Sequence, residues 1–191
     1  MALGPQLPAH NPHRLLDIGT GGGRHMLLAA ELGFCAFGVD ISLTGLLHTR
    51  ERMRQTRSPG SIALASMTSL PFAEGSFHAV VSYGSFYYGS AIEMRQAIAE
   101  THRVLAPGGK SFAVLRSTVD YRYGKGRELA PNTFELDISE TNELGTIQHF
   151  LTAEDVPKYF SPFSAVNFEK TEWTTCGRAR LNSDWLITAE K

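Results

Sequence analysis

The stretch Asp17-Ile18-Gly19-Thr20-Gly21-Gly22-Gly23 decides how the rest of the chain is interpreted. It follows the apolar run 14–18, which is typical of a buried parallel strand, and it precedes residues 24–32, whose apolar spacing indicates a helix. Glycines permit a turn with positive φ and let a ligand approach the backbone closely. The N–H groups at the start of the following helix can bind a polar or negatively charged group. The stretch therefore predicts a ligand-binding loop.

A second acidic residue, Asp40, ends the next apolar run, residues 35–40, twenty-one positions after Gly19. In an open α/β sheet, a carboxylate at the end of the neighbouring strand can accept both ribose hydroxyls of an adenosine. The alternative role for Asp40 is a cap for the helix predicted to follow it. Because the glycine loop comes directly before this strand, we favour ribose binding, and the pair predicts an adenosine-containing cofactor.

The glycine loop lacks the features of two other nucleotide-binding motifs. A dinucleotide fingerprint has Gly or Ala at the sixth position from Gly19, and this chain has Arg24 there. A phosphate-binding P-loop needs Gly-Lys-Ser/Thr, which the sequence does not contain. A nicotinamide-dependent oxidoreductase is therefore the least favoured enzyme class, and titration with NADH would test it.

Length and composition predict one globular domain. The chain has 191 residues, of which 42% are hydrophobic and 19% charged, and its formal net charge is -1. Disordered chains combine few apolar residues with high net charge, and proteins that bind nucleic acid through phosphate attraction are strongly basic. We therefore expect a folded protein that binds no nucleic acid.

The remaining composition points to a cytoplasmic protein without a metal centre. Cys35 and Cys176 are too few for a disulfide framework and have no zinc-ligand spacing around them. No stretch reaches the length of about 18 apolar residues that a membrane span needs, and no signal pattern opens the chain. We expect no membrane association and no metal, whereas the oligomeric state stays open.

Short apolar runs alternate with segments of helical spacing through the first two thirds of the chain. Such alternation is typical of parallel βαβ units with right-handed crossovers. The expected strands are 14–18, 35–40, 61–65, 79–82 and 111–115, and the expected helices are 24–32, 42–55 and 93–105.

The rhythm changes after residue 116. Residues 117–146 are polar, aromatic and irregular, a short helix is expected over 153–159, and two late strands are expected at 165–170 and 185–190. The predicted fold class is α/β: a doubly wound, mostly parallel seven-stranded sheet with helices on both faces and an antiparallel edge hairpin at the C-terminus.

The predicted organisation is an irregular lead-in over 1–13 and a single domain over 14–191. Within the domain, residues 14–116 form the cofactor-binding half and residues 117–191 the substrate-side half.

Two further motifs give the loop a family resemblance. The segment Ser66-Met67-Thr68-Ser69-Leu70-Pro71-Phe72 leads to Ser76-Phe77-His78, and Arg103-Val104-Leu105 leads to Pro107-Gly108-Gly109. Together with the D-x-G-x-G-x-G loop, they resemble the class I S-adenosylmethionine-dependent methyltransferases, in particular the small-molecule branch called type 11. The resemblance covers about residues 14–116. It departs at Ser66 and His78, where the family has acidic residues, and at the start, where the family has one or two helices.

The resemblance implies S-adenosyl-L-methionine as the cofactor and methyl transfer to a small-molecule acceptor by in-line displacement. A non-catalytic S-adenosylmethionine-binding regulator or partner protein is the alternative. Among the implied contacts, Asp17 receives the amino group of the cofactor or, alternatively, stabilises the loop. The implied cofactor-binding residues are Asp17, Gly19, Gly21, Gly23, Asp40, Ile41, Ser66, Met67, Ser82 and Tyr83.

Acceptor-side residues are expected where strands end at the ligand edge of the sheet. Tyr87 and Tyr88 follow the fourth strand and are expected to line the acceptor pocket, with Tyr87 also a candidate catalytic group. His149 precedes the late helix and is a candidate general base, because an imidazole has an unperturbed pKa of about 6.5. Each of these has a structural alternative. A mobile substrate loop is expected at Tyr121, Arg122 and Tyr123.

Overall fold

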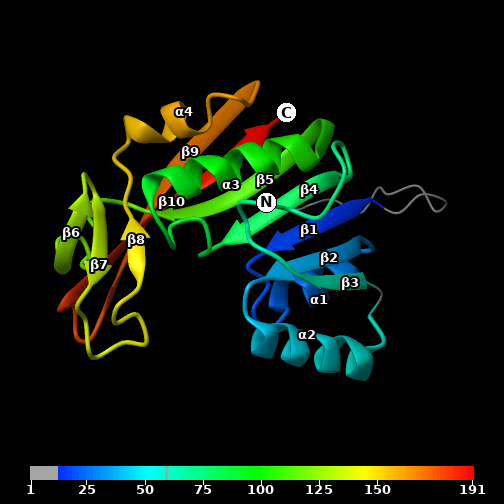
Figure 1. The fold of residues 1–191 in the computed structure, drawn as a ribbon, viewed down its shortest axis with the longest axis horizontal. Helices are drawn as coiled ribbons and strands as arrows, with labels where there is room; N and C mark the ends of the chain where they lie inside the picture. The colour runs from blue at the N-terminus through cyan, green and yellow to red at the C-terminus, as the bar shows by residue number, and fades with distance from the viewer. Residues whose placement is uncertain (1–12, 59) are drawn as a thin grey trace.

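A computed structural model of the chain describes residues 13–58 and 60–191 (Figure 1). The predicted lead-in, except for His13, lies outside the described residues.

The core of the fold is a seven-stranded sheet in the order β3-β2-β1-β4-β5-β10-β9. The first five strands in the chain pair in parallel, whereas β10 pairs antiparallel with both β5 and β9. The predicted doubly wound sheet with its C-terminal edge hairpin is therefore confirmed. The strands are β1 (Arg14–Ile18), β2 (Cys35–Asp40), β3 (Gly60–Leu64), β4 (Phe77–Tyr83), β5 (Leu105–Arg116), β9 (Ala165–Thr175) and β10 (Arg180–Glu190).

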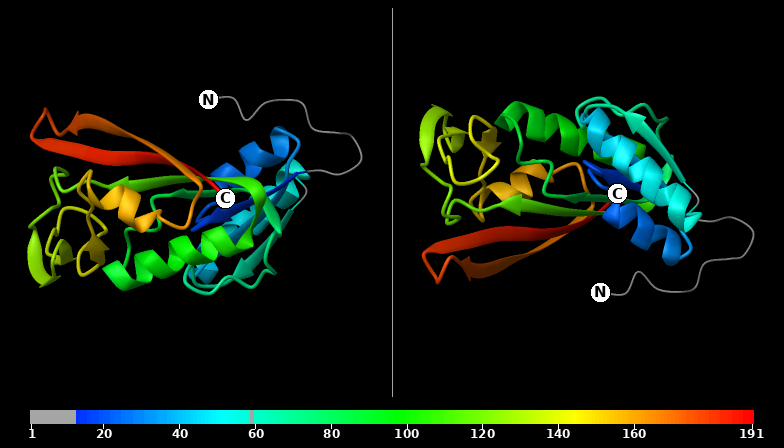
Figure 2. Two further views of the ribbon diagram at one scale, coloured as in Figure 1. Left: turned by 90° about the horizontal axis from the view of Figure 1, so that it is seen from above. Right: turned by 90° about the horizontal axis from the view of Figure 1, so that it is seen from below.

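Helices cover both faces of this sheet, because neighbouring strand residues point to opposite sides. Leu15 packs in one apolar cluster with Met26 of α1, whereas Leu16 packs in the other with Met94 of α3. Figure 2 shows α1 and α3 on opposite sides of the sheet. None of the described helices has the length and apolar composition needed to cross a membrane. The helices are α1 (Arg24–Glu31), α2 (Leu43–Thr56), α3 (Ala91–Val104) and α4 (Asp155–Tyr159).

The segment predicted to be irregular, residues 117–146, contains two strands of a second sheet whose third strand follows directly, which corrects the sequence prediction. Strands β6 (Gly126–Ala130), β7 (Thr133–Leu136) and β8 (Ile147–His149) pair antiparallel. The pattern was hard to find because β6 is exposed along its whole length and β8 has only three residues. Without a buried face, a strand shows no alternation of apolar and polar residues.

A buried ion-pair network ties this small sheet to the main one. Glu143 accepts hydrogen bonds from Arg116 Nη2 at 2.6 Å and from Arg122 Nε at 2.6 Å. Arg122 also donates to Asp120, whose other carboxylate oxygen accepts the backbone N–H of Ser183 in β10. The Glu143 side chain is only 9% exposed. Residues 117–146 are therefore an ordered part of the fold that ion pairs hold against the main sheet, and Arg122 is one of the residues in these ion pairs.

Replacing Glu143 with alanine should lower the free energy of unfolding by about 3–5 kcal/mol, because the buried guanidinium of Arg116 and the half-buried one of Arg122 lose their common anion. Chemical denaturation measures the loss. The matched control is Glu135→Ala, which removes an exposed ion pair with Arg127 in the same small sheet. That variant should lose less than about 1 kcal/mol. Equal losses in the two variants would contradict the network's role.

Candidate functional site

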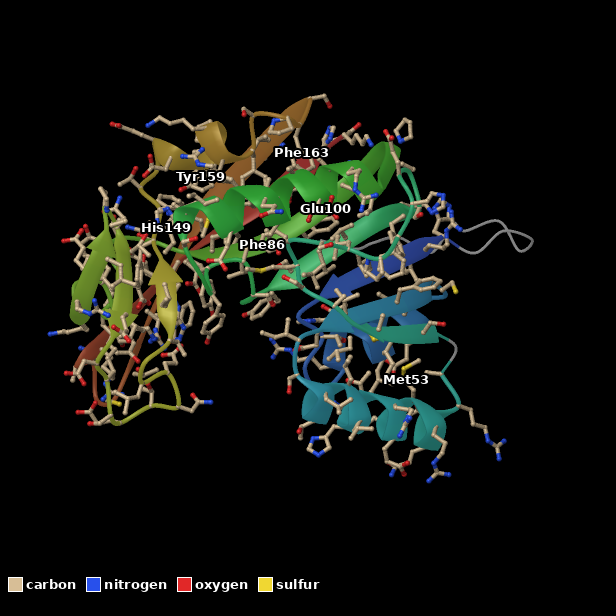
Figure 3. All side chains as sticks on the ribbon, in the orientation of Figure 1. Met53, Phe86, Glu100, His149, Tyr159 and Phe163 are labelled. Atoms are coloured by element: carbon tan, nitrogen blue, oxygen red, sulfur yellow. The ribbon has the colours of Figure 1, made fainter. Side chains whose placement is uncertain are left out.

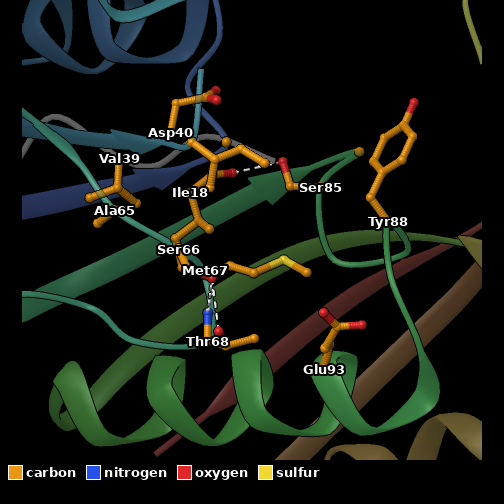
Figure 4. A pocket seen from close by; sticks show the side chains of 13 residues that line it. Ile18, Val39, Asp40, Ala65, Ser66, Met67, Thr68, Ser85, Tyr88 and Glu93 are labelled. Atoms are coloured by element: carbon orange, nitrogen blue, oxygen red, sulfur yellow. Dashed lines mark hydrogen bonds between the residues drawn. The ribbon is translucent and has the colours of Figure 1, made fainter. Parts of the chain in front are cut away.

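A pocket of about 370 Å³ opens at the carboxyl ends of the parallel strands (Figure 4). Its lining comes from the ends of β1 and β2, the segment 65–68 after β3, the turn after β4 and the start of α3. This is the edge of an open α/β sheet at which ligands bind.

Gly19 is the point at which two loops of the pocket meet. Its N–H donates to Val39 O at 2.8 Å, and the Oγ of Ser85 donates to Ile18 O at 2.9 Å. Gly19 has a φ of +74°, and a Cβ atom placed on it would overlap the Ser85 side chain. The position therefore needs glycine both for its backbone conformation and for space.

Asp40 lines the pocket and also braces the glycine loop. Its Oδ2 accepts the N–H of Gly21 at 2.8 Å, and its Oδ1 accepts the N–H of Ser42 at 2.8 Å. The helix cap that was the alternative role for Asp40 is supplied instead by Ser42, whose Oγ accepts the N–H of Gly45. Each carboxylate oxygen can accept a second hydrogen bond, so Asp40 can still bind hydroxyl groups in the pocket.

Helix α2 supports the glycine loop from the other side, and the sequence analysis missed this contact. Thr49 Oγ1 donates to Gly21 O at 2.7 Å, and Arg52 donates to Gly22 O at 2.7 Å. Gly45 packs so closely on the loop that a Cβ there would lie 3.2 Å from Gly21 O. The spacing of Thr49 and Arg52, one turn apart on one helix face, was the available signal.

Three of the predicted loop residues, Asp17, Gly21 and Gly23, lie outside the pocket lining. Asp17 is buried, its Oδ2 accepts the Oγ1–H of Thr20 at 2.9 Å, and its Oδ1 lies 3.6 Å from His25 Nδ1. Gly23 precedes α1 with a φ of +77°. The Oδ1 of Asp17 accepts no hydrogen bond from the described residues, so its contact with the amino group of the cofactor stays a prediction beside its support of the loop through Thr20.

Ser82 and Tyr83 also lie outside the lining, and the neighbouring residues Gly84 and Ser85 take that place. Ser82 is fully buried in β4, and Tyr83 faces α1, where Arg24 stacks 4.7 Å from its ring centre. The chain leaves the strand at Gly84, whose φ is +82°. The last two side chains of β4 point to opposite faces of the sheet, and the turn after the strand places Gly84 and Ser85 in the lining.

Three of the predicted residues, Ile41, Ser66 and Met67, line the pocket. Thr68 and Glu93 also line it, although the sequence analysis did not identify them. Ser66 Oγ lies 2.8 Å from Thr68 Oγ1, so the two hydroxyls share a hydrogen bond. A signal for Glu93 was present, because Ser90-Ala-Ile-Glu93 has the spacing of a capping box, and the structure contains that box.

The two tyrosines after β4 have different environments. Tyr88 lines the pocket, and its hydroxyl donates to Glu143 Oε1 at 3.2 Å. Tyr87 is buried beneath Arg116, whose guanidinium lies 4.3 Å from its ring centre. Burial raises the pKa of the Tyr87 phenol far above its ordinary value. Tyr87 is not part of the pocket lining. Because its phenol stays protonated at neutral pH, Tyr87 is also unsuited to act as a base.

The other predicted acceptor residues do not reach the pocket. Arg122 stacks 4.2 Å from the ring centre of Tyr121 and is paired with Glu143, as described above. Tyr123 donates to Asn132 Oδ1 at 2.7 Å and packs edge-on against Phe134. All three predicted residues of this segment hold the small sheet together.

His149 is the last residue of β8, and its buried side chain lies between β7 and α4, beside Tyr159 (Figure 3). Its Nδ1 lies 2.8 Å from Thr133 Oγ1, and its Nε2 lies 2.6 Å from the Tyr159 hydroxyl. Burial lowers the pKa of its imidazole to about 4. With both ring nitrogens engaged and no place in the pocket lining, His149 is not supported as a general base.

Comparison with known proteins gives one family match. Residues 15–109 match the family model described as "Methyltransferase domain". A demethylmenaquinone methyltransferase of Renibacterium salmoninarum is 36% identical over 97 residues, which are 51% of this chain and 38% of that protein. The chain thus spans less than half the length of this curated relative.

Solved structures share the fold over nearly the whole chain. An S-adenosylmethionine-dependent methyltransferase from Methanosarcina mazei aligns with a TM-score of 0.78 at 21% identity, over 93% of this chain and 92% of that one. The 1,6-didemethyltoxoflavin-N1-methyltransferase of Burkholderia thailandensis, solved with 1,6-didemethyltoxoflavin and S-adenosylhomocysteine, aligns with a TM-score of 0.71 at 17% identity, over 95% and 72%. At these identities the likeness establishes the fold.

The structural role of His149 predicts a specific pH dependence. Its folded pKa of about 4 lies below the ordinary 6.5, so its contribution to stability is complete above pH 6.5 and is lost as the pH falls towards 4. The stability advantage of the wild type over His149→Gln should therefore shrink by about 2 kcal/mol between pH 7.5 and pH 5.

Denaturation curves of both proteins at each pH measure this difference. Asp184, whose pKa burial raises to about 6, titrates in both proteins and cancels in the comparison. A difference that stays constant with pH would show that His149 is not held in its neutral form.

Proposed function

Because residues 15–109 belong to the methyltransferase-domain family of class I S-adenosylmethionine-dependent proteins, we propose that the chain binds S-adenosylmethionine and transfers its methyl group to a small-molecule acceptor. The observation that carries the proposal is the pocket in which Gly19, Asp40 and Met67 come together at the carboxyl ends of three neighbouring strands.

The lining residues fit the chemical groups of this cofactor. Asp40 presents a carboxylate that can accept ribose hydroxyls, and Ile41 and Met67 offer apolar surface for a purine ring. The Ser85 side chain occupies the position that a Cβ on Gly19 would take, so glycine lets the loop after β1 and the turn after β4 meet at the pocket wall. A carboxylate acceptor and apolar surface in one pocket thus support a nucleoside ligand.

The cofactor supplies a methyl group already activated on a positively charged sulfur, so the chain's contribution is binding, orientation and exclusion of water. Asp40 holds the nucleoside end, while Tyr88 and Glu93 line the wall formed by the turn after β4 and the start of α3. Within the described part of the chain, no histidine lines the pocket. We therefore propose that acceptors react as nucleophiles that need no strong base.

A small acceptor is favoured by the size of the pocket and by the formal net charge of -1, which gives no long-range attraction for nucleic acid. The relatives named above act, by their names, on demethylmenaquinone and on a toxoflavin precursor. A non-catalytic cofactor-binding protein remains the alternative, because Ser66 offers the adenine a weaker partner than the acidic residue of the family.

Two measurements on the wild-type chain test this function. Isothermal titration calorimetry should detect binding of S-adenosylmethionine, and a panel of small metabolites should contain acceptors that drive formation of S-adenosylhomocysteine. Binding without turnover on any acceptor would favour the alternative. The absence of binding would contradict the proposed function.

The Asp40→Asn variant should weaken S-adenosylmethionine binding by about 1.5–3 kcal/mol, the range for a hydrogen bond to a charged group. The amide retains one oxygen acceptor, so the variant is expected to fold, which its thermal unfolding curve will check. Calorimetry measures the affinity. An unchanged affinity in the folded variant would remove Asp40 from the ribose site.

A pair of glycine variants tests whether cofactor binding depends on the close contact of Gly19 with Ser85, separately from the backbone strain that alanine causes at a positive φ. Gly19 and Gly75 have similar positive φ values of +74° and +69°, but a Cβ at Gly75 has nothing within 4 Å. Gly19→Ala should therefore weaken cofactor binding by more than about tenfold, or 1.4 kcal/mol. Gly75→Ala should leave the affinity unchanged. Equal affinities in both variants would show that the cofactor does not depend on the contact of Gly19 with Ser85.

A further inference from the structure

Glu93 lies at the start of α3, across the pocket from Asp40, with Met67 between them (Figure 4). Its Oε2 accepts the backbone N–H of Ser90 at 2.7 Å and the Ser90 hydroxyl at 2.7 Å. Among the described residues, no donor contacts its Oε1. One carboxylate oxygen therefore fixes the side chain in place, and the other is available to the pocket.

The charges that line the pocket are negative. Asp40 and Glu93 are both carboxylates, and within the described residues no Lys, Arg or His is part of the lining. Hydrogen bonds from Ser90 lower the pKa of the Glu93 carboxyl, so the group is ionised at neutral pH. Each carboxylate oxygen of Asp40 accepts an N–H of the chain, from Gly21 or Ser42, whereas Glu93 uses only Oε2 in this way.

We propose, on the basis of the proposed function, that Glu93 makes this site selective for positive charge. The sulfonium of S-adenosylmethionine is attracted to a carboxylate in the pocket, whereas the neutral thioether of S-adenosylhomocysteine is not. Glu93 thus favours the substrate form of the cofactor over the product form.

The same charge selects the acceptor. In the transfer, the carbon–sulfur bond breaks with its electron pair staying on sulfur, and a lone pair of the acceptor forms the new bond to carbon. A neutral acceptor, such as an amine, takes over the positive charge, so the attraction to Glu93 persists through the transition state. An anionic acceptor would neutralise that charge and would be repelled on entry. Glu93 therefore favours acceptors that react as neutral nucleophiles.

The capping role of Glu93 can be separated from its charge. A glutamine at the third position of a helix also completes a capping box, because its amide oxygen accepts the same backbone N–H. Glu93→Gln therefore removes the charge and retains the hydrogen bonds of α3. Glu128→Gln is the matched control, since it removes an exposed carboxylate from β6, outside the pocket lining.

The experiment compares the affinities of S-adenosylmethionine and S-adenosylhomocysteine, measured by calorimetry in the wild type and the two variants. In Glu93→Gln, the affinity for S-adenosylmethionine should fall at least about threefold relative to that for S-adenosylhomocysteine, which stays within about twofold. Raising the salt concentration should reduce the difference, because salt screens a charge in an open pocket. Glu128→Gln should leave the affinity ratio unchanged.

Three other outcomes decide against the proposal. An equal loss for both ligands would mean that Glu93 acts only through the structure of α3. An unchanged ratio, or a shift that salt does not affect, would mean that its charge does not reach the cofactor. Failure of the wild type to bind either ligand would overturn the proposed function itself.

Discussion

The close approach of the Gly19 backbone to the Ser85 side chain is the contact on which the pocket depends. It joins the loop after β1 to the turn after β4, while Val39 O binds the N–H groups of Gly19 and Thr20 and adds the end of β2. Three strand ends are thereby held at one place. The pocket forms where these strand ends meet, and glycine at position 19 is required because Ser85 occupies the place of its side chain.

The second constraint is electrostatic and acts from the far side of the site. Glu143 joins Arg116 at the end of β5 to Arg122 in the segment before β6, and it also accepts the Tyr88 hydroxyl. The backbone N–H of Gly89 donates to Ile147 O at 2.8 Å, so the turn that carries Tyr88 rests on the small sheet. The small sheet consequently positions a wall of the pocket without contributing its own side chains to the lining.

The sequence was sufficient where one local pattern determines one structure. The glycine loop, Asp40 and the alternation of strands and helices predicted the sheet and the position of Gly19 and Asp40 in the pocket lining. It was insufficient where the outcome depends on pairing between distant residues. His149 is hydrogen-bonded to Thr133 and Tyr159, and Arg122 is hydrogen-bonded to Glu143, so both side chains have structural roles. None of these three partners is adjacent in sequence. Ser82 and Tyr83 lie outside the lining, and Gly84 and Ser85 lie in it, because the strand ends where Gly84 turns the chain.

If the space between Asp40 and Glu93 is the cofactor site, a crystal structure with S-adenosylhomocysteine bound will show the ligand there. The ribose hydroxyls should lie within hydrogen-bonding distance of the Asp40 carboxylate, and the homocysteine sulfur should face the side of the pocket formed by Ser85 and Glu93. Electron density for the ligand outside this pocket, or a ribose that makes no contact with Asp40, would contradict this assignment.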